Sequence, residues 1–345
     1  MKVKIGELTK IKTGKLDANA ASEDGQYPFF TCSREPLKIS TYSYDCECVL
    51  VAGNGDLNVK YYNGRFDAYQ RTYIIEDNGS GKLYMPYLYY FMEDYIEELR
   101  KQAIGGVIKY IKLGNLTDAM IELPSINEQK SIVDILEKAK KILDKRNKEI
   151  SALGNLIKAR FVEMFGSIHK STEYPYVAVK DLTDVISGGT PSRDKAEYWE
   201  DGTIPWVKTT ELQNNIIVNV DEYITEAGLN GSSAKLVPVG TVLVAMYGQG
   251  KTRGMTAYLN IEACTNQACA CILPSDKIDS MFMWKFFELS YEKIRSLAQG
   301  AGQPNLNGNM IKSFQVLVPP IELQKEYVDF VHQVDKSKVV VASVR

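Results

Sequence analysis

The segment Ala245-Met-Tyr-Gly-Gln-Gly-Lys-Thr contains the side chains whose types and spacing come closest to a known chemical motif. A small residue, four spacers and Gly-Lys-Thr fit a relaxed phosphate-loop pattern, in which backbone N–H groups and a lysine bind nucleotide phosphates. Such a loop must open onto a helix N-terminus, but Arg253-Gly254 and a strand-like Met-Thr-Ala-Tyr-Leu follow. The corresponding earlier loop, Ala52-Gly-Asn-Gly-Asp-Leu, has no lysine. Phosphate-loop nucleotide binding therefore stays a lesser alternative.

The same loop has a composition suited to contacts with DNA. It combines an amide, two cations and a hydroxyl on a glycine-rich turn, and such groups reach phosphates and base edges in a DNA groove. Loops in both halves of the chain carry similar side chains, and loops held by rigid elements are favoured as binding sites. The alternative is that they are solvated turns. The candidate DNA-binding residues are Arg34, Arg65, Gln70, Arg71, Lys208, Thr209, Thr210, Gln249, Lys251, Thr252, Arg253, Asn266, Gln267, Gln303 and Asn305.

The cysteines and histidines argue against metal or hydrolytic chemistry. The pairs Cys46-x-Cys48 and Cys269-x-Cys271 lack the spacing of zinc ligands, and both histidines lie far from them in sequence. The start of the chain does not resemble a signal peptide, so the six cysteines are expected to be buried, reduced thiols. Adenine methyltransferases carry an Asn/Asp-Pro-Pro-Tyr/Phe tetrapeptide, which this sequence lacks. We expect no metal, no cofactor and no catalytic residue in this chain.

Composition and charge narrow the classes of function further. A length of 345 residues allows about two domains, and 45% hydrophobic with 24% charged residues is typical of globular proteins. The net charge of −2 provides no overall basic field for nucleic acid. A protein that alone gripped many phosphates would be basic, so a partner is expected to share any DNA binding. No apolar run is long enough to span a membrane, and we expect a cytoplasmic protein.

The elements that would position these loops come from two copies of one plan. Residues 104–142 align without gaps over residues 299–337, so that Gln129 matches Gln324. Upstream, Val49-Leu-Val-Ala matches Val242-Leu-Val-Ala. The period is far longer than the 20 to 50 residues or so of a solenoid unit, so the chain contains a duplicated domain. Each copy begins with short β-rich runs and continues with a helical stretch.

A long helix closes each copy. Ser125 and Glu128 have the spacing of a capping box, and Gly166 is typical of a helix end, so the sequence predicts a helix over residues 127–165. Apolar residues alternate at spacings of four and three, which predicts a coiled-coil seam whose partner is the second copy. The alternative is that each helix packs separately on its own domain. The seam positions are Ile132, Leu136, Ala139, Leu143, Ile150, Leu153, Ile157, Tyr327, Val331, Val334 and Val341.

The predicted fold class is α+β, with two β-rich domains in tandem separated by two long antiparallel coiled-coil helices that follow an internal pseudo-twofold repeat. The first domain is expected over residues 1–125 and the central helix over 126–166. The second domain is expected over 167–320, and a short distal helix over 321–345.

Several stretches resemble the specificity subunit of type I restriction–modification systems, and the resemblance covers essentially the whole chain. They include LPSINEQKSIVDILEKAKKILDKRNKEI, VPPIELQKEYVDFVHQV, SGGTPSRDKAEYW, DGTIPWVKTTEL and VLVAMYGQGKTRGMTA. The resemblance implies that residues 1–125 and 167–320 are target recognition domains. Each would read one half of a split double-stranded DNA sequence, and the helix pair would act as a ruler between them.

The resemblance also implies partners. Two DNA methyltransferase subunits would dock on the chain, and restriction and translocase subunits would join for cleavage. S-adenosylmethionine, ATP and Mg²⁺ would belong to those partners, which leaves this chain non-catalytic. The second helix ends well before the match to the first helix is complete. Whether the chain has a second methyltransferase docking site symmetric with the first therefore stays an open question at this point. Alternatives are a specificity chain of a type II (IIB/IIG-like) enzyme, the nucleotide-binding protein considered above, and a coiled-coil adaptor with two protein-binding heads.

Overall fold

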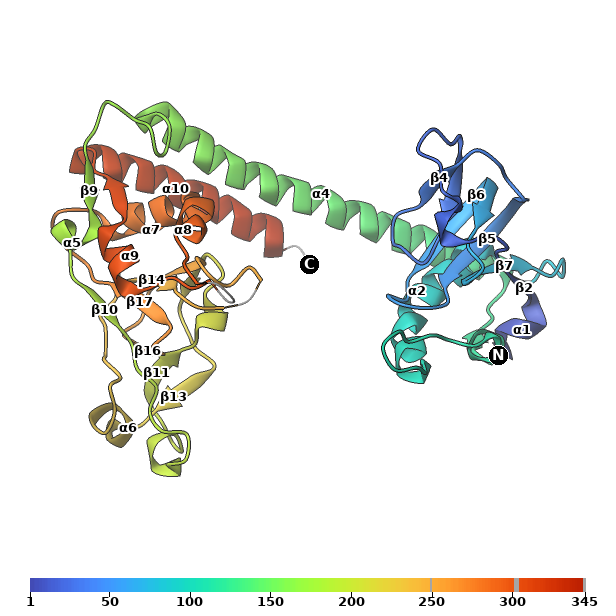
Figure 1. Cartoon of the computed structure of the whole chain (residues 1–345), viewed down its shortest axis with the longest axis horizontal. Helices are drawn as coiled ribbons and strands as arrows, with labels where there is room; N and C mark the ends of the chain where they lie inside the picture. The colour runs from blue at the N-terminus through green and yellow to red at the C-terminus, as the bar shows by residue number, and fades with distance from the viewer. Residues whose placement is uncertain (249, 301–303, 344–345) are drawn as a thin grey trace. The chain divides into compact units, whose positions relative to one another are not determined.

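The chain forms two compact units in a computed structural model, which describes residues 1–248, 250–300 and 304–343 and, of residues 339–343, the backbone alone. Unit 1 comprises Met1–Lys145 and unit 2 comprises Arg146–Arg345. Helix α4 (Ile126–Phe165) begins in unit 1 and ends in unit 2 (Figure 1). Each unit has its own sheets and its own hydrophobic core, as the two globules expected from the sequence require.

Unit 1 is built on a six-stranded sheet in the order β2-β7-β5-β6-β3-β4. Its centre is the run Val49–Ala52 of β5, which is buried and gains β propensity from two valines. Neighbouring strands are antiparallel, except that β3 and β6 are parallel. The strands are β2 (Thr9–Thr13), β3 (Tyr27–Phe30), β4 (Leu37–Ile39), β5 (Tyr44–Ala52), β6 (Val59–Ala68) and β7 (Thr72–Asp77).

Helix α2 (Met85–Gln102) covers this sheet with Leu88, Met92 and Leu99, which are fully buried. Their spacings of four and seven place them on one helix face, as an amphipathic helix requires. Strands β1 (Lys2–Lys4) and β8 (Met120–Glu122), the first and last strands of unit 1, form a small antiparallel pair. The remaining elements are α1 (Ile5–Leu8), the 3₁₀ helix Ala18–Ala20 and α3 (Leu113–Thr117).

Unit 2 repeats this plan with a five-stranded sheet in the order β10-β17-β14-β15-β12, a three-stranded sheet β13-β11-β16 and the pair β18-β9. Its strands are β9 (Tyr176–Ala178), β10 (Val185–Ser187), β11 (Ile204–Val207), β12 (Asn215–Ile217), β13 (Glu222–Ile224), β14 (Val242–Ala245), β15 (Thr256–Leu259), β16 (Cys264–Thr265), β17 (Cys269–Ile272) and β18 (Gln315–Leu317). Its helices are α5 (Val179–Leu182), α6 (Glu226–Asn230), α7 (Ser280–Leu289), α8 (Tyr291–Ser296), α9 (Gly308–Ser313) and α10 (Ile321–Ser343), with 3₁₀ turns at Ala196–Tyr198 and Thr209–Glu211.

The strand orders confirm the duplication. The run β2-β7-β5-β6 in unit 1 has the same order and the same antiparallel pairing as β10-β17-β14-β15 in unit 2. The strand pair that joins the ends of unit 1 recurs as β9 and β18 in unit 2. The fold class predicted from the sequence therefore agrees with the structure in its tandem, mixed α and β domains.

One buried glutamine ties each long helix to its own domain. Gln129, in the first turn of α4, accepts a hydrogen bond from the Tyr84 N–H at 2.8 Å and donates to the carbonyls of Lys82 and Pro124. Gln324, in the first turn of α10, accepts from the Asp279 N–H at 2.9 Å and donates to a proline carbonyl. In both units the bonded N–H lies just before the helix that covers the sheet.

The ends of α4 follow the sequence prediction. Ser125 and Glu128 exchange the two hydrogen bonds of a capping box, and Gly166 ends the helix with a φ of 76°, which an L side chain rarely adopts. Within unit 2, α10 runs beside the last part of α4 in the opposite direction (Figure 1). The Tyr327 hydroxyl donates to the Ile157 carbonyl at 3.3 Å across this contact.

The predicted seam is covered along only part of its length. Ile150 and Leu153 are half-buried, while Ile157, Tyr327, Val331 and Val334 are buried. Ile132, Leu136, Ala139 and Leu143 are exposed, which corrects the expectation that the second copy covers the whole seam within this chain. Helix α10 has 23 residues against 40 in α4, so it is too short to cover them. The side chain of Val341 lies outside the described residues, and coiled-coil geometry stays a prediction.

The cysteines are free thiols. Cys48, Cys264, Cys269 and Cys271 are buried, as predicted, whereas Cys32 and Cys46 are half-buried. Burial raises the pKa of the Cys264 thiol to about 11, so this thiol is protonated at neutral pH.

Candidate nucleic-acid interface

Three segments come together at one edge of unit 1. The loop after β5, residues 53–58, lies between the turn before β7 and the segment that follows α2. Gly53 connects them, because its N–H donates to the Arg71 carbonyl at 2.8 Å and its carbonyl accepts from the Ile111 N–H at 2.9 Å. We name residues 53–58 loop 1. Its neighbours on both sides are thus fixed by backbone hydrogen bonds that do not depend on side-chain identity.

The same arrangement recurs in unit 2. The loop after β14, described at residues 246–248 and 250–254, is named loop 2. The Met246 N–H donates to the Ala268 carbonyl at 2.8 Å, in the turn before β17, and the Met246 carbonyl accepts from the Leu306 N–H at 3.0 Å. Both units therefore present one edge on which the loop after the central strand is held between two other segments. Most of the candidate DNA-binding residues lie on or beside these two edges.

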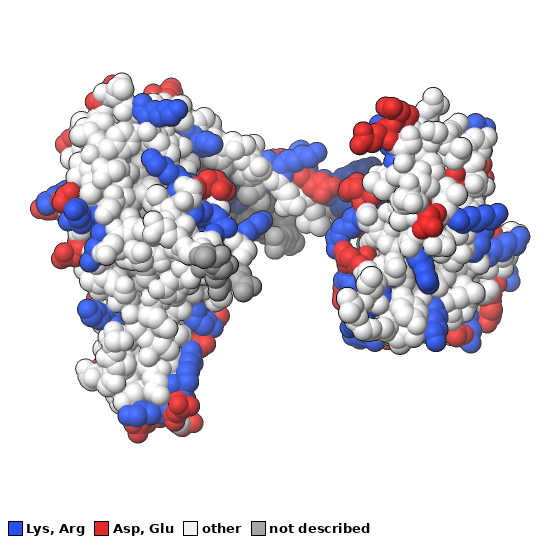
Figure 2. Space-filling view, viewed as in Figure 1, with Lys and Arg blue, Asp and Glu red and all other residues white. Residues whose placement is uncertain are grey.

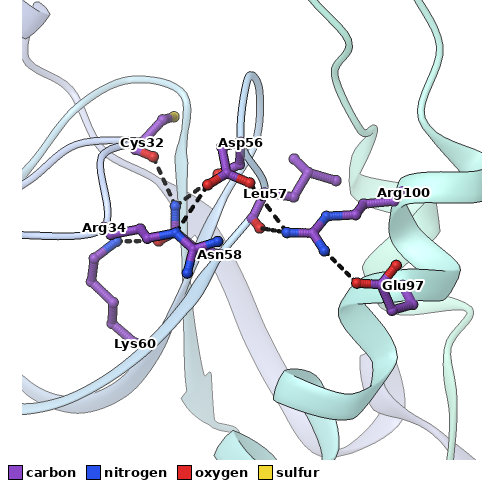
Figure 3. Close-up of polar contacts among 8 residues, drawn as sticks. All are labelled: Cys32, Arg34, Asp56, Leu57, Asn58, Lys60, Glu97 and Arg100. Atoms are coloured by element: carbon purple, nitrogen blue, oxygen red, sulfur yellow. Dashed lines mark hydrogen bonds and ion pairs between the residues drawn. The ribbon is translucent and has the colours of Figure 1, made fainter. Parts of the chain in front are cut away.

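Loop 1 is held by charged side chains (Figure 3). Asp56 lies between two guanidinium groups: Arg34 Nε donates to Asp56 Oδ2 at 3.0 Å, and Arg100 Nη2 donates to Asp56 Oδ1 at 3.1 Å. The hydrogen bond from Arg34, together with both positive charges, holds the pKa of the Asp56 carboxyl below its usual range. Arg100 also pairs with Glu97 on its own helix. Arg34 is 71% exposed and keeps donors that face solvent.

A lysine extends this cluster towards the strand that follows. Lys60 donates to Asn58 Oδ1, and Asn58 Nδ2 donates to the carbonyls of Cys32 and Asp56 at 2.8 Å (Figure 3). Burial lowers the pKa of Lys60. Arg34, Asn58 and Arg100 also line a cavity of about 370 Å³. The loop that begins at Cys32, loop 1 and helix α2 are thus joined in one polar cluster.

The other unit 1 candidates lie in two places. Gln70 and Arg71 are exposed in the turn beside loop 1. Arg65 lies on β6, where its guanidinium stacks over the Tyr42 ring at 4.8 Å and donates to Asp45 at 3.0 Å. The structure therefore brings Arg34, Gln70 and Arg71 to the edge that contains loop 1, whereas Arg65 has separate partners.

Loop 2 is held through its backbone. Arg295 of α8 donates from Nη1 to the Arg253 carbonyl at 2.7 Å and to the Lys251 carbonyl at 3.4 Å. The Tyr291 hydroxyl, one turn earlier, donates to the same Lys251 carbonyl at 2.7 Å. Arg253 donates to the Pro304 carbonyl. The Lys251 side chain is exposed, and Thr252 is half-buried.

The remaining unit 2 candidates gather on the strand ends next to loop 2. Asn266 Nδ2 donates to Thr209 Oγ1 at 3.4 Å, and Thr190 donates to the Gln267 side chain. Lys208 pairs with Glu222 at 3.0 Å and with Asp221 at 3.4 Å, so its charge is neutralised locally. Thr210 is exposed, and Asn305 is half-buried. Gln249 and Gln303 lie outside the described residues.

Sequence reasoning missed the two arginines that hold the loops, Arg100 and Arg295. Arg100 lies on α2, which covers the sheet of unit 1, and Arg295 lies on α8, which follows α7; the helical pattern explained their neighbours but assigned them no role. A signal was present, because Arg100 and Arg295 are 195 residues apart, as are Gln129 and Gln324. Extending the gapless match four residues upstream would have paired them.

The surface and the loop geometry limit what chemistry this edge can do. Basic and acidic side chains are interspersed on the face of both units that Figure 2 shows. Lys251 and Thr252 lead into β15 rather than into a helix, so the helix N-terminus that a phosphate loop needs is missing at this loop.

In the described parts of the chain, no three His, Cys, Asp or Glu side chains gather as ligands for a metal ion. Among the described helices, none is both long and apolar enough to cross a membrane.

Known proteins are similar to this chain in sequence. The family model of the type I restriction modification DNA specificity domain matches residues 1–152 and 172–340. The specificity subunit of the Escherichia coli type I restriction enzyme EcoDI is 44% identical over 135 residues, which span 39% of this chain and 30% of that protein. The EcoR124I/EcoR124II specificity subunit of Escherichia coli is 22% identical over 282 residues, 79% of this chain and 68% of that protein.

A solved structure has a similar fold. The S subunit of a type I restriction–modification system from M. genitalium superposes with a TM-score of 0.65 at 16% identity, over 99% of this chain and 91% of that chain. The match to EcoDI spans less than a third of that protein's length. Because the family model covers most of both units, this chain belongs to the type I restriction modification DNA specificity family.

Proposed function

We propose that this chain is the DNA-recognition subunit of a type I restriction–modification complex. Each unit reads one half of a split double-stranded target with the edge that contains loop 1 or loop 2. The observation that carries this proposal is the recurrence of one edge in both units. The hydrogen bonds of Gly53 to Arg71 and of Met246 to Ala268 place two different loops in equivalent positions on two equivalent sheets.

The contrast between a scaffold common to both units and loops that differ between them supports sequence reading. The backbone of each loop is fixed at its base, whereas its side chains differ completely between the units: Asn54 and Asp56 in loop 1, Lys251 and Arg253 in loop 2. Base edges in the major groove are distinguished by donors and acceptors, so two loops with different side chains suit two different half-sites. A rigid scaffold with exchangeable loops is a common arrangement for specific binding.

The net charge of the chain supports a function that depends on partner subunits. The chain has a net charge of −2, and Lys208 and Arg34 each pair with acidic groups of the chain itself. Affinity for DNA comes largely from phosphate neutralisation by basic groups. We therefore propose that methyltransferase subunits, two in the full complex, supply much of the phosphate binding, and that restriction and translocase subunits join the same complex. The chain itself is non-catalytic, and S-adenosylmethionine, ATP and Mg²⁺ bind the partners.

The test is co-expression of the chain with the methyltransferase subunit encoded beside it, followed by genome-wide mapping of methylated adenines. The expected result is one split motif, with two short half-sites and a fixed gap. The chain expressed alone and the methyltransferase expressed alone serve as controls, and neither should methylate that motif. A stable complex that methylates a continuous motif, or none, would contradict the proposal.

A loop exchange assigns the half-sites. Replacing residues 250–253 of loop 2 by the loop residues of a relative with another target should change one half-site and leave the other unchanged. A matched control replaces four exposed residues on α4, Lys138, Lys140, Lys141 and Lys148, by alanine; recognition at both half-sites should then persist. An unchanged motif after the loop exchange would show that loop 2 does not determine the half-site.

A further inference from the structure

An arginine at the same position of each repeat reaches the loop of its unit. Arg100 and Arg295 are 195 residues apart, and each follows a fully buried residue, Leu99 or Ile294, that belongs to the hydrophobic core of its unit. Because the preceding side chain faces the core, the arginine emerges at the border of the buried helix face. From there its guanidinium reaches the loop after the central strand, in both units.

Both arginines bind main-chain carbonyls. Arg100 Nη2 donates to the Leu57 carbonyl at 3.1 Å, and Arg295 Nη1 donates to the Arg253 carbonyl at 2.7 Å. Leu57 lies five residues after Ala52, whereas Lys251 and Arg253, whose carbonyls accept from Arg295, lie six and eight residues after Ala245. In both units the contacts therefore fall in the second half of the loop, although the loop sequences differ.

A carbonyl contact fixes the path of a loop without restricting its side chains. Arginine presents five N–H donors in a planar fork, so one side chain can bind several carbonyls, or a carbonyl and a carboxylate, at once. Lysine has a single ammonium on a flexible stem and cannot match that geometry. The loop side chains are then free to differ between units and to face a ligand.

In unit 2 Arg295 comes close to the backbone of loop 2 at Gly254. Gly254 has a φ of 85°, and a Cβ placed there would lie 2.9 Å from Cγ of Arg295. The Gly254 N–H donates to the Ala245 carbonyl at 2.8 Å, which closes loop 2 at its base. Loop 2 thus returns to its strand at a residue whose conformation and lack of a side chain both accommodate the arginine.

We propose that Arg100 and Arg295 are positioning residues, each of which holds the loop that reads one DNA half-site in its reading conformation. The proposal rests on the proposed function and deepens it, because it separates residues that contact DNA from residues that fix the loops. Neither arginine needs to touch DNA. A loop released from its arginine keeps its side chains but presents them in many conformations, so discrimination between bases falls.

The first experiment tests loop order in the free chain. Hydrogen exchange of the Gly254 and Met255 amides is compared between wild type, Arg295→Met and the control Lys293→Met, which changes an exposed residue on the same helix. Release of the loop should speed exchange about tenfold or more in Arg295→Met alone, because local opening becomes easier. Unchanged exchange in folded Arg295→Met would overturn the proposal, whether or not the chain binds DNA.

The second experiment tests recognition in the assembled methyltransferase. Methylation rates are measured on duplexes with the correct target and with one base pair changed in either half-site. Arg295→Met should lose discrimination about tenfold in the half-site assigned to loop 2 only, and Arg100→Met in the other half-site only, since one base pair contributes roughly that factor or more. Lys101→Met, next to Arg100 and 76% exposed, is the matched control.

The conservative exchange separates positioning from folding. Arg295→Lys keeps the charge and one donor group, so it should fold and discriminate at a level between wild type and Arg295→Met. If Arg295→Met does not fold, the lysine variant alone decides: full discrimination would overturn the proposal, and partial loss confined to one half-site would support it. Equal loss at both half-sites would also overturn it. A wild-type complex without a split motif would contradict the proposed function. The hydrogen-exchange experiment on the free chain would still test the two arginines.

Discussion

Equivalent positions of the two units differ in burial. Tyr327 of α10 and Phe282 of α7 are fully buried in unit 2, where the Phe161 ring of α4 lies 5.5 Å from the Tyr327 ring and 6.0 Å from the Phe282 ring. The residues 195 positions earlier are Ile132, which is 37% exposed, and Tyr87, which is half-buried. The same scaffold therefore closes a hydrophobic core in one unit and leaves the matching surface open in the other.

The loops show a second difference on the same scaffold. Loop 1 is held by one carboxylate as well as a carbonyl, since Asp56 lies between Arg34 and Arg100. Loop 2 is held by carbonyls that bind Arg295 and Tyr291. Duplication thus preserved the sheet order, the glutamine and the arginine, whereas the groups around them diverged. The two units therefore share a scaffold, while the divergent groups give each unit its own loop contacts.

The largest expected difference between the units is at the position of Tyr327. Tyr327→Ala removes a fully buried ring and should lower the free energy of unfolding of unit 2 by about 3 to 5 kcal/mol. Ile132→Ala, at the matching exposed position, should change the stability of unit 1 by less than about 1 kcal/mol. All three tryptophans, Trp199, Trp206 and Trp284, lie in unit 2, so their fluorescence during urea unfolding reports on that unit.

Unit 1 needs a separate probe, because it contains no tryptophan. Exchange of its β5 amides follows its unfolding in the same samples. Equal destabilisation by Tyr327→Ala and Ile132→Ala, each in its own unit, would contradict this difference. The surface around Ile132 would then contribute as much to the stability of unit 1 as the buried Tyr327 ring contributes to that of unit 2.

At the glutamines the two units should behave alike. Gln129→Leu and Gln324→Leu each leave a half-buried N–H and at least one carbonyl without their partner. The loss should be about 1 to 3 kcal/mol in each unit. Tryptophan fluorescence measures it for Gln324→Leu, and amide exchange in β5 measures it for Gln129→Leu. A Leu variant that is as stable as wild type would mean that the helix junction tolerates an apolar replacement.

Local sequence patterns predicted the features that depend on neighbouring residues. The buried strand runs at Val49 and Val242, the capping box at Ser125 and the glycine that ends α4 were all correct. The duplication itself followed from matching residues. Burial along the seam was predicted wrongly near Leu136, because a seam shows that a helix face is apolar and does not show how much of it a partner covers.

The site was harder to predict, for a related reason. Loop residues were chosen by type and by their place after strands, which found Arg34, Arg71 and Lys251 on the two edges. Arg100 and Arg295 act on backbone carbonyls, and carbonyls carry no sequence signature. Only the packing of each helix within its unit determines which carbonyl a guanidinium reaches. The repeat was the one source of information in the sequence that could have identified them.

The smallest expected effect separates the loops by pH. The hydrogen bond from Arg34 and the nearby Arg100 charge lower the pKa of Asp56, so its carboxylate is stabilised in the folded chain. That stabilisation is fully present above the ordinary carboxyl value of about 3.9 and is lost as the pH falls through the lowered folded value. A ¹³C NMR titration should place the midpoint of the Asp56 carboxyl below the ordinary value, and Arg34→Met should raise it.

Loop 2 provides the internal control for that titration, because carbonyls do not titrate. The backbone resonances of Lys251 and Arg253 should stay constant across the pH range in which loop 1 changes. If Asp56 titrates at the ordinary value, its ion pairs do not hold loop 1, since both lie at the surface where such pairs contribute little. The carbonyl of Leu57 would then be the contact that matters, and the two units would hold their loops in the same way after all.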